Sequence, residues 1–359
     1  EALDQTIAEP EIIPNKKTEL EDVYAPFDNQ EILPQKLQNR EIRFIDAISE
    51  AIEISMKNHP NLVLMGQDIA EYGGAFKITE GFVEKFGKKR VRNTPLCEAA
   101  IVGSGLGLSI NGYKSMVEMQ FADFVTEGFN QIINNLAKTH YRWNQNADVV
   151  VRMPTGAGTG AGPFHSQSNE AWFTKTPGLK IAYPAFPDDA KGLLIQSFED
   201  PNPVLFFEHK KLYRSLKGNV PEGFYTTPFG KARKVKEGNE LTIITYGLGV
   251  HIALEFAEKN PEISLEIVDL RTLIPLDTET IYESVKKCNK VIILHEDTLT
   301  CGFGAELSAL ISEHCFEDLD APILRVASMD TPIPFNKKLE DQFMPNEELA
   351  EAVDKILKY

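Results

Sequence analysis

The sequence predicts an α/β protein of two domains, each built on a mostly parallel sheet with helices on both faces. The chain has 359 residues, which at roughly 150 residues per domain suggests about two domains. Short apolar runs of strand length alternate along it with stretches of helical period. Strands of that kind, separated by helices, are typical of parallel sheets that are covered on both faces.

The composition excludes several classes of protein. Hydrophobic residues make up 42% and charged residues 25%, as in globular proteins, and we find no apolar run near the ~18 residues of a membrane span. The net charge of −16 argues against nucleic-acid binding, because phosphate backbones would be repelled. Four cysteines without a C-x-x-C pair fit a reducing compartment. We therefore expect the cytoplasm, or the mitochondrial matrix in a eukaryote.

The first half of the chain supplies an arm and a first domain. Residues 1–40 contain four prolines and no sustained apolar period, so we expect an extended acidic arm that lies on a neighbouring domain or subunit. Residues 41–215 form the first domain, which opens with a helix that ends at Asn58-His59-Pro60. Its strands are expected at 62–66, 115–119, 149–153, 179–183 and 204–208. Its further helices are expected at 98–110, 124–141 and 187–198.

The second half repeats this alternation after a polar stretch. We expect residues 216–240 to be a linker and residues 241–359 to be the second domain. Its strands are expected at 241–246, 265–268, 291–294 and 323–326. Its helices are expected at 250–259, 278–287 and 304–312.

Glu98 is the first candidate for chemistry. It falls in the first turn of the helix predicted at 98–110, where an acid can simply complement the helix dipole. That helix is apolar or glycine-rich on nearly every face, so the carboxylate is expected at a buried edge. A buried carboxylate needs a hydrogen-bonding partner or has a raised pKa, which makes Glu98 a candidate acid or base.

Two histidines and two glycine clusters are further candidates. His165 follows a strand and a glycine-rich run, which suits proton transfer and equally suits a solvated loop residue. His295 ends an apolar strand, and we expect a hydrogen-bonded structural role for it. The run 156–162 could hold phosphate through its amides but lacks a phosphate-loop pattern, and the glycines of 103–107 are expected to allow close packing inside a helix.

Five separated motifs occur in an order that resembles one family. They are Asn-Thr-Pro-Leu-Cys-Glu at 93–98, Glu-Met-Gln-Phe-Ala-Asp-Phe at 118–124, His-Ser-Gln-Ser at 165–168, Asp-Leu-Arg-Thr-Leu-Ile-Pro-Leu-Asp at 269–277, and Leu-Thr-Cys-Gly-Phe-Gly at 299–304. This series resembles the β subunit of the thiamine diphosphate-dependent decarboxylase component of 2-oxoacid dehydrogenase complexes. The resemblance covers roughly 40–359. It implies a pyrimidine-binding domain over 41–215 and a transketolase-type C-terminal domain over 241–359.

The resemblance also implies roles for individual residues. Glu98 matches the glutamate that hydrogen-bonds a ring nitrogen of the cofactor's aminopyrimidine, and Leu96, Gln120 and Phe124 match positions that line this ring. His165 matches a histidine that assists substrate or acyl handling, including transfer to a lipoyl group.

Metals and partners are implied in the same way. A structural potassium ion is common in these subunits, held largely by backbone oxygens, and the matching residues are Ala147, Val149, Val150, Ser197, Asp200 and Asn202. The family's Gly-Asp-Gly motif for diphosphate and Mg²⁺ is absent, so these ligands are expected from an α subunit in an α2β2-like assembly. A lipoyl-bearing dihydrolipoyl acyltransferase is the further partner implied.

Substrate and chain organisation stay open at this point. The motifs favour a branched-chain 2-oxoacid such as 3-methyl-2-oxobutanoate, with pyruvate dehydrogenase and acetoin dehydrogenase subunits as alternatives. A non-catalytic α/β protein that binds a nucleotide or docks partners is the alternative from another class. Residues 19–25 resemble the C-terminal tail of the family's α subunit, so we expect the chain to be the downstream part of an α–β fusion.

Overall fold

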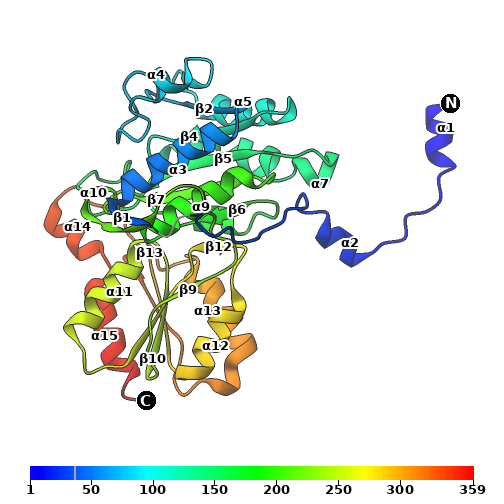
Figure 1. Cartoon of the computed structure of the whole chain (residues 1–359). Helices are drawn as coiled ribbons and strands as arrows, with labels where there is room; N and C mark the ends of the chain where they lie inside the picture. Colours follow the sequence, from blue (N-terminus) through cyan, green and yellow to red (C-terminus); the bar gives the residue numbers. More distant parts are fainter. Residues whose placement is uncertain (36–37) are drawn as a thin grey trace.

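Two sheets form the framework of the chain, and the computed structural model describes it over residues 1–35 and 38–359 (Figure 1). The first sheet has the strand order β12-β6-β7-β5-β4-β2-β3, in which β12 alone pairs antiparallel. Its strands are β2 (Leu62–Gly66), β3 (Val91–Asn93), β4 (Lys114–Glu118), β5 (Val149–Thr155), β6 (Lys180–Ala182), β7 (Val204–His209) and β12 (Thr272–Ile274). The α/β class expected from the sequence is confirmed.

Helices cover both faces of this sheet because its central strands β2, β5 and β7 are buried at every position. In β2, Leu62 and Leu64 join one core, whereas Val63 and Met65 join the core on the opposite face. Helices α3 and α9 pack on the first face and α5 on the second. The helices of this domain are α3 (Phe44–Asn58), α4 (Phe82–Phe86), α5 (Glu98–Ile110), α6 (Val125–Asn130), α7 (Thr139–Trp143), α8 (Ala171–Thr174), α9 (Pro187–Glu199) and α10 (Leu212–Ser215).

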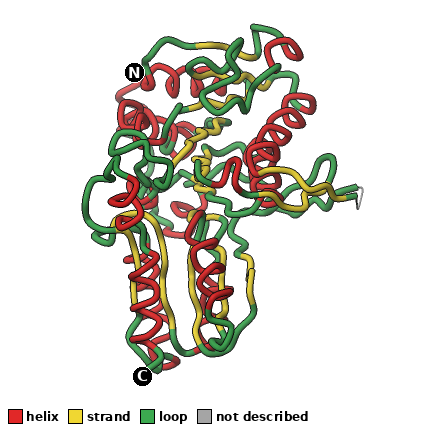
Figure 2. The backbone as a smooth tube through the Cα atoms, turned by 90° about the vertical axis from the view of Figure 1, so that its left-hand side faces the viewer, coloured by secondary structure: helices red, strands yellow, loops and turns green. Residues whose placement is uncertain are grey.

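The second sheet has the order β14-β13-β10-β11-β9, with β9 antiparallel (Figure 2). Its strands are β9 (Arg233–Lys236), β10 (Leu241–Thr245), β11 (Leu265–Asp269), β13 (Val291–Thr298) and β14 (Leu324–Ser328). The accompanying helices are α11 (Leu248–Lys259), α12 (Thr278–Cys288), α13 (Gly304–Cys315), α14 (Lys337–Phe343) and α15 (Asn346–Ile356), with a 3-10 turn, η3 (Phe316–Asp318). Figure 2 shows the strands running between these helices.

Three segments differ in detail from the sequence expectation. The helix expected at 124–141 is divided into a 3-10 turn, η1 (Ala122–Phe124), then α6, a π-helical turn, η2 (Gln131–Leu136), and α7. The arm carries two short helices, α1 (Ala2–Ile7) and α2 (Lys16–Glu21), that project from the body in Figure 1. The segment expected as a linker holds β9 and also β8 (Lys217–Pro221), which pairs antiparallel with β1 (Asn39–Arg43).

None of the helices within the described ranges has the length and apolar character needed to cross a bilayer.

Candidate active site

The candidate site lies at one edge of the first sheet. Strands β2, β4 and β5 run parallel, so their carboxyl ends meet at this edge, where ligands bind in open α/β sheets. Gln67 follows β2, Gln120 to Phe124 follow β4, and the loop with His165 follows β5. The motifs that lie far apart in the sequence are therefore brought to one place by the topology.

Glu98 begins helix α5 and is 9% exposed. The side-chain amide of Gln67 donates a hydrogen bond of 2.9 Å to Glu98 Oε1. Within residues 1–35 and 38–359, Glu98 Oε2 accepts no hydrogen bond. Glu98 lies at the positive end of the helix, and the Gln67 amide holds one oxygen while the other stays free for a ligand.

Two aromatic rings pack against His165 on the loop after β5. The ring of Phe121 lies 4.7 Å from the His165 ring and that of Phe124 lies 5.4 Å from it, both nearly edge-on. Gln120 Nε2 lies 3.5 Å from Asp68 Oδ2, and Asp68 is the residue after Gln67. The structure thus brings Gln120, Phe124 and His165 together and connects them to Glu98 through the turn after β2.

Leu96 stands apart from this group because its side chain is 81% exposed. Three polar atoms at the same edge are buried and have no hydrogen-bond partner among the described residues: Gln67 Oε1, Thr94 Oγ1 and Asp123 Oδ2. Buried polar atoms without partners are costly, and the amino and ring nitrogens of an aminopyrimidine are groups that could satisfy them. The residues at this edge therefore fit the heterocyclic half of the expected cofactor.

The residues expected to hold potassium lie next to one another where β5 begins and α9 ends. The Ala147 amide donates to the Pro201 carbonyl at 3.1 Å. Asp200 pairs with the Lys180 ammonium, and the Asn202 side chain binds both the N–H (2.7 Å) and the C=O (3.0 Å) of Ala25. Both side chains are engaged within the chain, so a cation here would depend on backbone oxygens. Among the described residues, no group of three or more His, Cys, Asp or Glu side chains could hold a metal.

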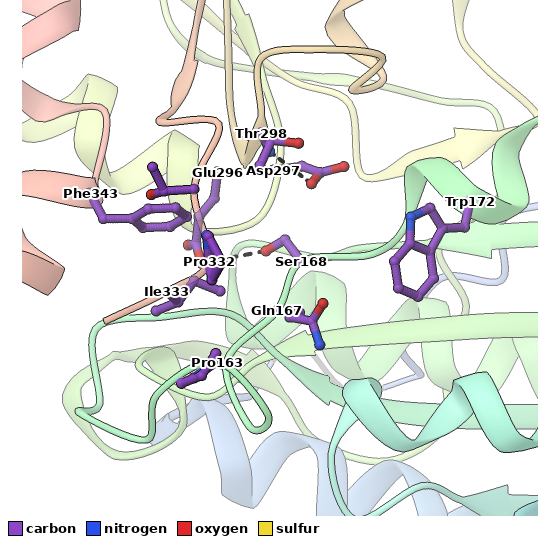
Figure 3. Close-up of a pocket in the computed structure, with 11 residues that line it drawn as sticks. Pro163, Gln167, Ser168, Trp172, Glu296, Asp297, Thr298, Pro332, Ile333 and Phe343 are labelled. Atoms are coloured by element: carbon purple, nitrogen blue, oxygen red, sulfur yellow. Dashed lines mark hydrogen bonds between the residues drawn. The ribbon is translucent and has the colours of Figure 1, made fainter. Parts of the chain in front are cut away.

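A cavity of about 280 Å³ lies between part of the His165 loop and the second domain (Figure 3). Gln167 and Ser168 line one side, and Glu296 and Asp297 at the end of β13 line the other. Burial raises the pKa of Asp297 to about 7. The cavity is therefore an acidic space between the two domains.

Sequence analysis missed two residues that contact the candidate site residues. Gln67 follows a predicted strand directly and Phe121 lies inside a quoted motif, so position alone could have identified both. The expectation for His295 is wrong in part: it is buried and stacked 6.3 Å from Tyr246, but neither ring nitrogen has a hydrogen-bond partner among the described residues. Burial lowers the His295 pKa to about 4, so the ring is neutral.

Comparison with known proteins identifies the family of the chain. The transketolase pyrimidine-binding domain family matches residues 40–215, and the transketolase C-terminal domain family matches residues 230–349. The 2-oxoisovalerate dehydrogenase β subunit of Bacillus subtilis is 47% identical over 314 residues, covering 86% of this chain and 96% of that protein. The mitochondrial counterpart of Dictyostelium discoideum is 44% identical, covering 90% and 88%.

More distant proteins share the architecture. The pyruvate dehydrogenase E1 component β subunit of Bacillus subtilis is 40% identical, covering 89% of this chain and 99% of that protein. A solved split-gene transketolase, an inactive β4 tetramer, superposes with a TM-score of 0.70 at 24% identity, covering 88% and 99%, and it shows the fold alone. The chain therefore belongs to the family of β subunits of thiamine diphosphate-dependent 2-oxoacid dehydrogenases, oxidoreductases that work together with an α subunit.

Proposed function

We propose that this chain is the β part of a branched-chain 2-oxoacid dehydrogenase that acts on acids such as 3-methyl-2-oxobutanoate. In this reaction the carboxylate leaves as CO₂ and the acyl carbon forms a bond to one lipoyl sulfur of a dihydrolipoyl acyltransferase. The lipoyl disulfide takes up the two electrons, and its second sulfur becomes a thiol. The two 2-oxoisovalerate dehydrogenase β subunits, at 47% and 44% identity, support the branched-chain substrate.

The buried carboxylate of Glu98 is the observation that carries this proposal. Thiamine diphosphate, when bound, supplies the electron sink for the decarboxylation. Glu98, fixed through Oε1 by Gln67, is placed to hold a ring nitrogen of the pyrimidine with its free Oε2. Gln120 and Phe124 would line the ring, and Leu96 would reach it once a partner covers its exposed side chain. His165, packed against two aromatic rings, would handle the acyl group.

The remaining ligands belong to the proposal as well. We assign the Mg²⁺ and diphosphate ligands to the α half, since this chain lacks the motif for them. Potassium would bind through backbone oxygens near Ala147, Val149, Val150, Ser197, Asp200 and Asn202. Four free cysteines are consistent with work in the cytoplasm or a mitochondrial matrix.

The deciding experiment replaces Glu98 in the complex with the α half. Glu98→Gln keeps the shape and the amide contact but removes the charge, and we expect decarboxylation to fall by roughly 10² or more, the usual size of an acid–base contribution. Titration with thiamine diphosphate, followed by circular dichroism, separates loss of binding from loss of chemistry. Glu127→Gln, an exposed acid in α6, is the matched control and should keep full activity.

If Glu98→Gln leaves decarboxylation intact, the role proposed for Glu98 is wrong; if the unmodified complex decarboxylates no 2-oxoacid, the non-catalytic interpretation is right. A panel of 2-oxoacids, assayed with the α half, Mg²⁺ and an artificial electron acceptor, then fixes the substrate. Preference for branched acids over pyruvate is expected. The pyruvate dehydrogenase and acetoin oxidoreductase β subunits, each 40% identical to this chain, make pyruvate and acetoin the comparison substrates.

A further inference from the structure

The glycine-rich loop between β5 and His165 has the backbone of an anion-binding site. Its glycines adopt the left-handed region in alternation: the φ angles are +91° at Gly156, +83° at Gly158, +70° at Gly160 and +74° at Gly162. Alternation of this kind turns successive amide N–H groups toward one side and forms a concavity that attracts negative charge. From the sequence alone, a phosphate was a possible anion for the amides of this loop.

The occupant in the structure is a carboxylate of the second domain. Glu340, on α14, is 2% exposed and accepts from the Gly158 amide at 2.8 Å and from the Gly160 amide at 3.1 and 3.0 Å. One carboxylate therefore satisfies two amides of the loop. Hydrogen bonds of this charged type are stronger than bonds between neutral groups.

A second carboxylate fixes the start of the loop. Glu296, at the end of β13, accepts from the Ala157 amide at 2.6 Å, and its other oxygen lies 2.5 Å from His209 Nε2. Figure 3 shows Glu296 facing Ser168, whose hydroxyl lies 3.4 Å from the same carboxylate. Both carboxylates come from the second domain, and both hold backbone or side chains of the first.

The part of the loop that Glu340 holds leads directly to His165. The His165 amide donates to the Gly162 carbonyl at 3.3 Å. Gly162 itself lies against the ring of Phe335, where a Cβ atom would come within 2.2 Å of the ring. At the far end, the Thr155 hydroxyl donates to the Gln167 carbonyl at 2.8 Å. With both ends of the loop fixed, its tip is held by Glu340 and Phe335.

We propose that Glu340 is a positioning residue that holds the His165 loop against Phe121 and Phe124 by binding the loop amides. This inference rests on the proposed function, because it gives His165 its task in acyl handling. The negative charge of Glu340 takes the place of a bound anion, so the second domain fixes the geometry of the histidine.

Hydrogen exchange in the complex with the α half tests the anchoring directly. In Glu340→Gln we expect amide exchange in residues 156–168 to rise at least tenfold, and Glu340→Asp should recover part of the protection. Asp341→Asn is the matched control, because Asp341 lies beside Glu340 on α14 but, among the described residues, forms only a surface pair with Lys337. Its exchange should equal that of the unmodified protein.

Two activity assays on the same variants test the effect on His165. We expect acyl transfer to a free lipoyl domain to fall about tenfold more in Glu340→Gln than turnover with an artificial electron acceptor. A general loss of folding would lower both rates equally, and an equal loss would overturn the proposal. Unchanged exchange in Glu340→Gln would overturn it as well. If the unmodified complex decarboxylates no 2-oxoacid, the proposed function fails, and the exchange rates alone then decide whether Glu340 orders the loop.

Discussion

Glu170 is a buried acid at the junction of the two domains. The Tyr246 hydroxyl donates to Glu170 Oε1 at 2.8 Å, and Oε2 has no partner among the described residues. Burial, with the nearby charge of Asp297, raises the Glu170 pKa to about 8. The folded chain therefore keeps a proton that the unfolded chain loses near its ordinary value of 4.5. Folding takes up this proton between those two pH values, so Glu170 makes the protein less stable as pH rises through the interval.

Glu170→Gln should remove this dependence, because a glutamine keeps an oxygen for Tyr246 and does not ionise. We expect the gap in stability between variant and unmodified protein to widen from pH 5 to pH 8 in favour of the variant. The difference in the free energy of unfolding can grow by at most about 1.4 kcal/mol per pH unit. Thermal unfolding at half-unit steps of pH measures this stability difference, with Glu258→Gln at an exposed position as the control. Parallel curves for Glu170→Gln and the unmodified protein would show that Glu170 does not titrate in this range.

Single residues of the site differ in how far the sequence could reveal them. Glu98 was predictable from the sequence because its own helix is apolar on most faces, which indicates burial. Glu340 was not, since its partners Gly158 and Gly160 lie far away in the sequence and no local pattern links a charged helix to a glycine loop in another domain. Contacts of that kind follow from the tertiary arrangement alone.

Helix α5 uses its glycines in two different ways. A Cβ atom at Gly105 would meet Val117 and Ser115 at 3.0 and 3.1 Å, so this glycine allows close packing on the sheet as the sequence predicts. A Cβ atom at Gly107 would meet nothing within 4 Å among the described residues, and Gly107 borders a groove of about 1070 Å³. Close packing within this chain therefore explains only part of the glycine content of α5.

A pair of alanine substitutions tests that difference. Gly107→Ala should raise the melting temperature of the isolated chain, because alanine gains up to about 1 kcal/mol over glycine within a helix. Gly105→Ala should lower it, since the crowded methyl group outweighs the same gain. Differential scanning calorimetry compares both with the unmodified chain. Equal shifts of one sign would mean that the contacts of Gly105 do not constrain α5.

Long elements with a clear period were predictable, and short ones were not. The helix predicted at 278–287 spans Thr278–Cys288 in the structure, because the Asp277 side chain caps its first turn and its buried residues recur every three or four positions. Strands β3, β9 and β12 were missed, since three or four residues at a sheet edge carry no period of their own. The stretch at 124–141 has helical composition throughout, but its wide turn η2 depends on i→i−5 bonding such as that from the Ala137 amide to the Ile132 carbonyl.

The two domains are joined by more than a connecting segment. Strand β12 lies in the second half of the sequence, but it pairs with β6 at the edge of the first sheet. Its Leu273 is fully buried in a core that also contains Leu179 and Tyr183 of the first domain. The first sheet is therefore completed only when the second domain is present.

We expect the chain to unfold in one cooperative transition for this reason. Trp143 and Trp172 both lie in the first domain, so tryptophan fluorescence reports that domain while circular dichroism reports the whole chain. The two urea curves should coincide, as in a two-state transition. Leu273→Ala should move both to lower urea together, at a cost of about 2–5 kcal/mol. Two separate midpoints would contradict the coupling.

The two hydrogen bonds between the Asn202 side chain and the Ala25 backbone have a consequence for the arm. A side-chain amide that binds the N–H and the C=O of one residue recognises polypeptide backbone and ignores the side chain attached to it. The path of the arm over the body is held here and at neighbouring points, since the Tyr24 hydroxyl donates to the Leu179 carbonyl at 3.0 Å and the Tyr141 hydroxyl donates to Glu19 at 2.5 Å. Residues inserted ahead of position 19 would lengthen the free portion without shifting where the arm first meets the body.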